Sequence, residues 1–258
     1  MSTKDRAVYA TQPQPLRQQV DQLLLHTDPA HIDGALMALI VPDTNLLRGG
    51  ETAARMFKSL RDRSFDTVIL IAPSHTGSFE RIHICSVDAY HTPLGAVPVN
   101  DRMRNELCDE DDDIFLDDTG HYHVEGVDVQ LPYLQALLTD FDVVPIVMGE
   151  GSPDLCRELG HAVGEVMYNR RTLIVASANL VAATDEALEQ FRTHFEALDV
   201  DRLFPLLSGS DLQVDGQGPL LVALIAALHH RANTAQVVQL VPPMEDQMGL
   251  LGAAVYRA

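Results

Sequence analysis

Asp66-Thr67-Val68-Ile69-Leu70-Ile71-Ala72-Pro73-Ser74-His75 is the most informative stretch of this chain. Its β-branched and aliphatic residues form a continuous apolar run that stops at a proline, which is typical of a strand buried on both faces of a parallel sheet. In open α/β sheets, ligands bind in the crevice beyond the carboxyl ends of the strands. His75 therefore lies where a metal ligand or an acid/base residue is expected.

Similar apolar runs and helical periodicities alternate along the rest of the chain. The runs predict strands over residues 35–41, 67–71, 82–87, 143–148, 172–176, 236–241 and 250–256. Amphipathic or apolar periodicities predict helices over residues 51–60, 129–138, 153–168, 185–198 and 218–231. Alternating strands and helices indicate an α/β fold, with a mixed, mostly parallel sheet covered on both faces. No repeat, linker or change in composition marks a second domain, so we expect one domain over residues 1–258.

Composition excludes several classes of function. The formal net charge of −19 disfavours nucleic acids and anionic membrane surfaces as partners. The chain has no apolar stretch of 18 residues, and its first residues lack the apolar core of a signal peptide. Three widely spaced cysteines suit a reducing compartment. We therefore expect a cytoplasmic location. The chain has only two lysines, and this together with the excess of acid fits either adaptation to high salt or an arginine-rich codon usage.

Several short motifs, taken in order, resemble those of the Memo-like family, whose bacterial and archaeal members are called AmmeMemoRadiSam system protein B. No single motif is specific, but their order and spacing are. They are Val8-Tyr9, a helix over 16–24, Ile40-Val41-Pro42, Ala72-Pro73-Ser74-His75, Thr92-Pro93-Leu94-Gly95, Pro98-Val99, Val129-Gln130-Leu131-Pro132-Tyr133-Leu134, Val144-Pro145-Ile146, Ala176-Ser177, Gly216-Gln217-Gly218-Pro219 and Gly252-Ala253-Ala254-Val255-Tyr256.

The resemblance implies a three-layer α/β/α domain similar in fold to class III extradiol dioxygenases, which hold ferrous iron in a crevice at the strand ends. It also implies a cleft built from five segments. His75 keeps the family's residue type, whereas Asp43 and Glu125 stand where the family usually has histidines. Asp215 stands at the usual cysteine, while the usual aspartate and histidine of the fourth segment are replaced by Ala178 and Val181.

These replacements predict a candidate metal set of Asp43, His75, Glu125 and Asp215, with His75 as the candidate catalytic residue. One imidazole with several carboxylates suits Fe(II), Mn or Mg better than a softer ion. His121 or His123 is a candidate second imidazole. The resemblance further implies that the pocket is lined by Ser74, Ser177, Asn179 and Gly216.

Two functions remain open at this point. In the first, the chain is a Memo-like protein with a degenerate metal site, acting as a binding or structural component with a small-ligand cleft and no required metal. In the second, it is a metal-dependent enzyme, dioxygenase-like or hydrolase-like, with carboxylate-rich ligands. The helix that starts near Pro219 directs its positive end at the cleft, which favours a small anionic ligand. A homodimer is the expected assembly, because symmetric dimers are the commonest.

Overall fold

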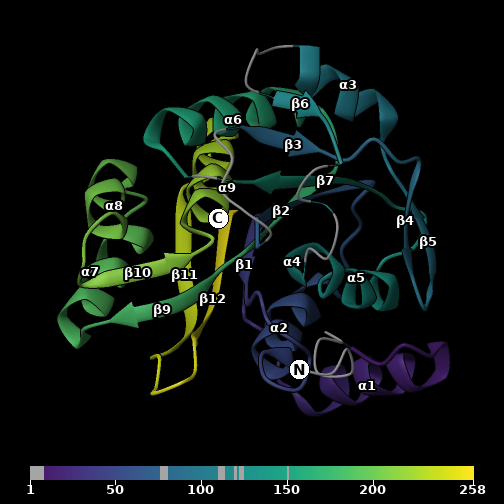
Figure 1. Cartoon of the computed structure of the whole chain (residues 1–258), viewed down its shortest axis with the longest axis horizontal. Helices are drawn as coiled ribbons and strands as arrows, with labels where there is room; N and C mark the ends of the chain where they lie inside the picture. The colour runs from purple at the N-terminus through teal and green to yellow at the C-terminus, as the bar shows by residue number, and fades with distance from the viewer. Residues whose placement is uncertain (1–8, 76–80, 110–113, 119–120, 122–124, 150) are drawn as a thin grey trace.

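The computed structural model describes residues 9–75, 81–109, 114–118, 121, 125–149 and 151–258. For Asp109 and Glu125 it describes the backbone alone. Within these residues, ten strands form one sheet in the order β10-β9-β12-β1-β8-β2-β7-β3-β6, and β11 pairs with β12 (Figure 1). Their bounds are β1 Ala35–Val41, β2 Thr67–Pro73, β3 Ile82–Ile84, β6 Ile114–Leu116, β7 Asp142–Met148, β8 Thr172–Ser177, β9 Asn179–Ala183, β10 Leu212–Asp215, β11 Thr234–Val241 and β12 Gly249–Arg257.

The sheet is mixed, and its parallel part occupies the centre. Strands β1, β8, β2 and β7 are neighbours with parallel pairing, and β3 pairs with β6 in the same way. The pairs β1–β12, β9–β12, β9–β10, β11–β12 and β3–β7 are antiparallel. Strand β8 lies between β1 and β2, although it follows them by about a hundred residues in the sequence. The predicted α/β fold with a mixed, mostly parallel sheet is confirmed.

Two apolar cores lie on opposite faces of the sheet, because successive strand residues point to opposite sides. Along β2, Ile69 and Ile71 enter one core, while Val68, Leu70 and Ala72 enter the other. The first core is covered by α6 and α9, with α3, α7 and α8 beside them, and the second by α1, α2 and α5 (Figure 1). The helices are α1 Pro13–His26, α2 Gly50–Phe57, α3 Asp101–Asp109, α4 Glu125–Asp128, α5 Leu131–Leu137, α6 Pro153–Val166, α7 Asp185–Glu196, α8 Val200–Leu207 and α9 Gln217–His229, with a 3-10 turn at Lys58–Leu60.

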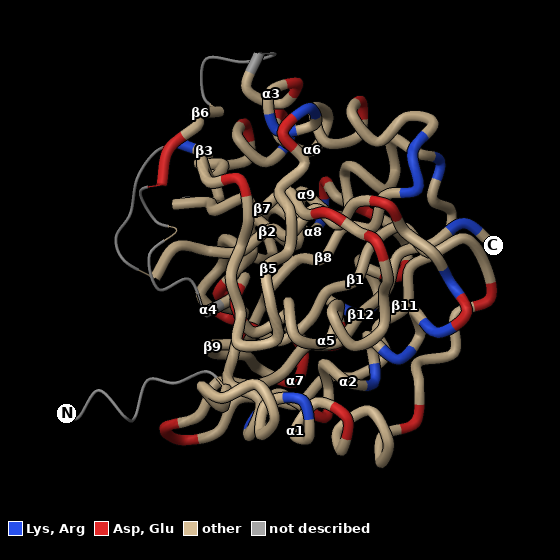
Figure 2. The backbone as a smooth tube through the Cα atoms, turned by 90° about the vertical axis from the view of Figure 1, so that its right-hand side faces the viewer, with Lys and Arg blue, Asp and Glu red and all other residues tan. Residues whose placement is uncertain are grey.

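Helix α9 is the most deeply placed of these helices. Its residues from Gly218 to Ala227 are all buried, and it contacts β1, β2 and β8 on the sheet side and α6 and α8 on its other sides. This burial explains why the helix is apolar all round. Charged residues lie on the outer helices and loops, whereas the central strands carry none except Asp142, at the start of β7 (Figure 2).

The structure departs from the predicted elements at several places. The strand predicted over 82–87 ends at Ile84. Beyond it, the carbonyls of Cys85 and Val87 accept hydrogen bonds from the Arg104 guanidinium, at 3.1 and 2.9 Å, and not from a neighbouring strand. A hairpin of β4 (Ala89–Thr92) and β5 (Gly95–Pro98) follows and was not predicted. Strands β6, β9 and β10 and helices α3, α4 and α8 were not predicted either.

One further observation bears on the predictions. No helix in the described part of the chain is long and apolar enough to cross a membrane. The extent of the single domain stays a prediction.

Candidate metal centre

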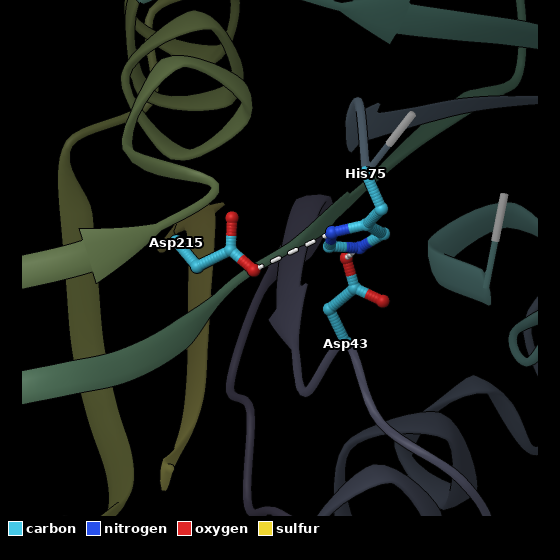
Figure 3. Close-up of side chains that lie close together, drawn as sticks. All are labelled: Asp43, His75 and Asp215. Carbon is cyan, nitrogen blue, oxygen red and sulfur yellow. Dashed lines mark hydrogen bonds and ion pairs between the residues drawn. The ribbon is translucent and has the colours of Figure 1, made fainter. Parts of the chain in front are cut away.

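Three side chains from distant parts of the sequence meet at the carboxyl ends of the central strands (Figure 3). Asp43 comes two residues after β1, His75 two residues after β2, and Asp215 is the last residue of β10. The His75 Nε2 lies 3.0 Å from Asp43 Oδ2, and its Nδ1 lies 3.8 Å from Asp215 Oδ2. One ligand atom from each of the three residues lies within 4.8 Å of the other two. Each nitrogen of the His75 ring therefore faces a carboxylate.

The backbone of Asp43 is held in place by the side chain of Asn179. The Asn179 side chain accepts a hydrogen bond from the Asp43 N–H at 3.1 Å and donates one to the Asp43 carbonyl. Both residues are buried, with Asn179 fully so. Asp43 Oδ1 is buried and has no hydrogen-bond partner in the described structure. A buried carboxylate oxygen without a partner is costly, so this atom is an acceptor available to a further group.

A second buried network joins the strand ends to α4. The Gln130 Nε2 donates to the Pro42 carbonyl at 3.0 Å and to Ser177 Oγ at 3.1 Å. Ser177 Oγ donates in turn to the Gly126 carbonyl at 2.7 Å. Helix α4 approaches Asp43 so closely here that a Cβ on Gly126 would lie 2.7 Å from Asp43 Oδ2. The ends of β1 and β8 and the start of α4 are thus held together beneath the site.

Asp215 reaches the site through the pairing of β10 with β9, which sets it opposite Asn179. The next residue, Gly216, has φ +88° and forms the N-terminal boundary of α9. A side chain at Gly216 would also collide with the Ser177 carbonyl oxygen, so glycine is required for both reasons. Burial raises the pKa of Asp215 above its ordinary value, the positive charge of His75 lowers it, and the Asp43 charge raises it further.

The two contacts of the ring differ in kind. The 3.0 Å between His75 Nε2 and Asp43 is a hydrogen-bond distance, whereas the 3.8 Å to Asp215 exceeds one. A carboxylate that accepts a hydrogen bond from one ring nitrogen orients a histidine so that its other nitrogen can bind a metal. The donor set fits a divalent ion on three grounds. It contains an imidazole and two carboxylates, its atoms converge, and Asp43 Oδ1 has no partner among the described residues.

A cavity of about 480 Å³ opens beside Asp215. Two of the predicted pocket residues, Ser74 and Gly216, line it together with Ser152 and Pro153 at the start of α6 and Gln217 at the start of α9. Two helix N-termini therefore face the same space. Ser177 and Asn179 do not line this cavity. Both are buried, and their hydrogen bonds hold α4 and Asp43.

The remaining candidate residues lie elsewhere or outside the described residues. Glu125 begins α4, directly before Gly126, but its side chain is not described, and His123 lies outside the described residues. His121 faces the His83 carbonyl and lines a different cavity, so it does not join the Asp43–His75–Asp215 cluster. At the fourth segment Ala178 is buried, whereas Val181 is exposed on β9.

Sequence reasoning gave no role to Gln130, although the motif that contains it was noticed. Its signal was a polar residue within the apolar run from Val129 to Leu134. A buried polar residue in such a run must find hydrogen bonds, and it finds them at the site.

Comparison with known proteins identifies the family. The family model for Memo-like protein matches residues 6–241. A MEMO1 family protein of Saccharolobus solfataricus is 30% identical over 202 residues, covering 73% of this chain and 70% of that protein. A MEMO1 family protein of Nitrosopumilus maritimus is 24% identical over 197 residues, covering 74% and 72%.

A solved structure supports the same fold. The crystal structure of uncharacterized protein JW3007 from Escherichia coli K12 superposes with a TM-score of 0.54 at 15% identity, covering 85% of this chain and 99% of that one. The relation to extradiol dioxygenases stays a prediction. The match of the family model over most of the sequence shows that this chain belongs to the Memo-like family.

Proposed function

We propose that this chain is a binding member of the Memo-like family that takes one divalent cation at Asp43, His75 and Asp215 and a small anionic ligand in the adjoining cavity. Fe(II), Mn and Mg are the candidate ions. The observation that carries the proposal is the convergence of one ligand atom from each of these three residues within 4.8 Å of the other two. Asp43 Oδ1, which is buried and has no partner in the described structure, adds a further acceptor. In this proposal the metal site is reduced from the family's pattern to one imidazole, but it remains usable.

Electrostatics support a cation at this position. Two carboxylates share one imidazole, so the cluster keeps a net negative charge even when His75 is protonated. The raised pKa of Asp215 expresses the cost of this arrangement, of which burial is the largest part. A divalent ion would remove the repulsion and would bind between groups that are already close. His75 Nδ1 and Asp215 would hold the ion, Asp43 Oδ2 would orient the ring, and Asp43 Oδ1 is the third candidate ligand atom.

The cavity supports a ligand of negative charge. The N-termini of α6 and α9 both face it, and Ser74 and Ser152 add hydroxyl groups. Partial positive charge at a helix N-terminus attracts anions. Asp215 also lines this space and would repel an anion when no cation is bound. We therefore expect anion binding to depend on the ion.

Calorimetric titration of Mn²⁺ into protein stripped with EDTA tests the proposal. Wild-type protein is expected to bind one ion per chain, and His75→Ala and Asp215→Asn are expected to weaken binding at least about 100-fold, since each removes a ligand. Asp211→Asn is the matched control, because Asp211 is an exposed aspartate directly before the strand that ends at Asp215. No uptake of Mn²⁺, Fe²⁺ or Mg²⁺ at micromolar concentration would disprove the proposal.

A second candidate function is a metal-dependent enzyme, dioxygenase-like or hydrolase-like. The observation that favours it is exposure: about 30% of the His75 and Asp215 side chains is open to solvent, which would leave room for a substrate beside an ion. An ion there would polarise a bound group as a Lewis acid. Oxygen uptake by Fe(II)-loaded protein with catechols, and hydrolysis of model esters by Mn-loaded protein, test this candidate. Absence of both in protein that binds the ion favours the binding function.

We also propose a cytoplasmic location, without nucleic-acid or membrane partners, and a homodimer. The three free cysteines and the net charge of −19 support the first two. Sedimentation of the purified chain tests the third.

A further inference from the structure

A group of three histidines lies where α6 packs against α9. These two helices have the most extensive contact of any helix pair in the described part of the chain (Figure 1). His161 is on α6, and His229 and His230 are at the C-terminal end of α9. The N-terminus of α9 borders the cavity beside Asp215, and the 13 residues of the helix span about 20 Å. The histidines are therefore separate from the candidate metal centre.

The rings of His161 and His229 lie close enough to share one ion. Their centroids are 5.9 Å apart, and the ring planes meet at 70° in a T-shaped arrangement. Both side chains are exposed, so an ion can reach them from solvent. Two bonds of about 2.1 Å to a tetrahedral ion place two imidazole nitrogens about 3.4 Å apart. Rings at this centroid distance can adopt that separation when the exposed side chains rotate.

The packing of the two helices fixes His229 and His230 beside α6. A Cβ on Gly164 would lie 2.7 Å from the Cβ and the Cγ of His229, so the glycine leaves room for this side chain. His230 Nε2 lies 2.5 Å from the Gly164 carbonyl oxygen, which can only accept, so Nε2 donates. Gly164 follows His161 by three residues and lies on the same face of α6. His161 and His229 therefore share one surface before any ion binds.

The electrostatics of this surface favour a cation. The C-terminal end of a helix carries partial negative charge, and α9 ends here. Glu165, exposed and one helical turn after His161, adds a carboxylate on the same face of α6. Among the described residues, no third donor joins the two rings as closely as the donors of the metal centre lie to one another. Water or the Glu165 carboxylate would therefore complete the coordination.

The donor type determines which ion fits. Imidazole suits Zn²⁺, Cu²⁺ and Ni²⁺, whereas Mg²⁺ and Mn²⁺ prefer oxygen ligands. We propose that His161 and His229 form a second, two-histidine site that binds one Zn²⁺ ion and thereby ties α6 to α9. This site does not depend on the function proposed for Asp43, His75 and Asp215.

Calorimetric titrations of Zn²⁺ and of Mn²⁺ test the proposal, in protein stripped with EDTA and then freed of the chelator. Wild-type protein is expected to bind one more Zn²⁺ ion than Mn²⁺ ions per chain, because only Zn²⁺ suits the two-histidine site. His161→Ala is expected to abolish binding of the additional ion or to weaken it at least about tenfold, since one of two protein ligands is lost. Equal numbers of Zn²⁺ and Mn²⁺ ions in wild type, or an unchanged additional ion in His161→Ala, would overturn the proposal.

Two further variants locate the additional ion. His26→Ala is the matched control, because His26 is an exposed histidine in the last turn of another helix, α1. His75→Ala alters the metal centre alone. Both variants should retain the additional Zn²⁺ ion, and its loss in either would contradict the assignment to His161 and His229. If His161→Ala does not fold, His161→Gln, which keeps a polar side chain at this exposed position, must show the same loss of Zn²⁺.

Discussion

Asn179→Ala is expected to be among the most damaging single substitutions near the site. The amide of Asn179 joins the start of β9 to the backbone of Asp43, 136 residues earlier in the sequence. Alanine removes both hydrogen bonds and leaves the N–H and the carbonyl of Asp43 inside packed protein. Because Asn179 is fully buried, water cannot replace the lost amide without a structural change.

The size of the effect follows from the two polar groups of Asp43 that lose their hydrogen bonds. An unsatisfied buried polar group costs about 1–3 kcal/mol, so two of them cost about 3–4 kcal/mol after partial relaxation. For a chain of this length, 1 kcal/mol lowers the melting temperature by about 2–4 °C. We therefore expect a decrease of roughly 10 °C. The affinity for Mn²⁺ should fall as well, since Asp43 loses its fixed position.

Thermal unfolding followed by circular dichroism measures the decrease, with Asn105→Ala as the control. Asn105 is exposed on α3, and alanine there should change the melting temperature by less than about 2 °C. If Asn179→Ala melts within 2 °C of wild type, about the spread expected of the control, the Asn179 amide does not hold Asp43 as described and the reasoning is refuted.

Three further predictions concern other parts of the molecule. Gly216→Ala should lower the free energy of unfolding in urea titrations by more than about 3 kcal/mol, because it combines φ +88° with a clash against the Ser177 carbonyl oxygen. Gly95→Ala, at φ +126° with open space around it, should cost only about 1–2 kcal/mol, and equal losses would contradict the clash. Glu106 has a pKa lowered by hydrogen bonds from Arg102 and Arg170, so the stability that its charge provides is present above the ordinary pKa and is lost as the pH falls through the lowered one. Glu106→Gln should therefore lower the melting temperature more at pH 7 than at acidic pH, and an equal decrease at both would exclude the charge as its cause. Cys85 is buried and has a pKa of about 11, so about one thiol in a thousand is ionised at pH 8. A mass-mapped alkylation time course should leave it unmodified until urea unfolds the chain, and rapid labelling of the native protein would contradict its burial.

The central strands were predictable because they are buried on both faces. Continuous apolar runs such as residues 35–41 and 67–71 admit few other interpretations, and β1 and β2 have nearly those bounds. Strand β10 was not predictable, since Leu212-Gln213-Val214-Asp215 is short and owes its conformation to pairing with β9. Helix α8 contains Pro205 in its interior, which argues against a helix until its apolar face is seen to pack on α9.

The candidate site was likewise predictable only in part. Motif order suggested that Asp43, His75 and Asp215 lie together, and the structure places their ligand atoms within 4.8 Å of one another. Motif order could not reveal that Asn179 binds a backbone 136 residues away, because such a contact depends on three-dimensional packing. Whether Glu125 joins the metal set stays a prediction.

The position of β8 between β1 and β2 has a consequence for biosynthesis. When the ribosome has completed residue 171, β1 and β2 have emerged, but the strand that joins them has not. The N-terminal two-thirds of the nascent polypeptide therefore cannot close its sheet, and it exposes the apolar edges of both strands until Thr172–Ser177 arrives. Such late, long-range pairing slows folding and invites aggregation. Production of this protein should accordingly benefit from slow translation at low temperature or from added chaperones.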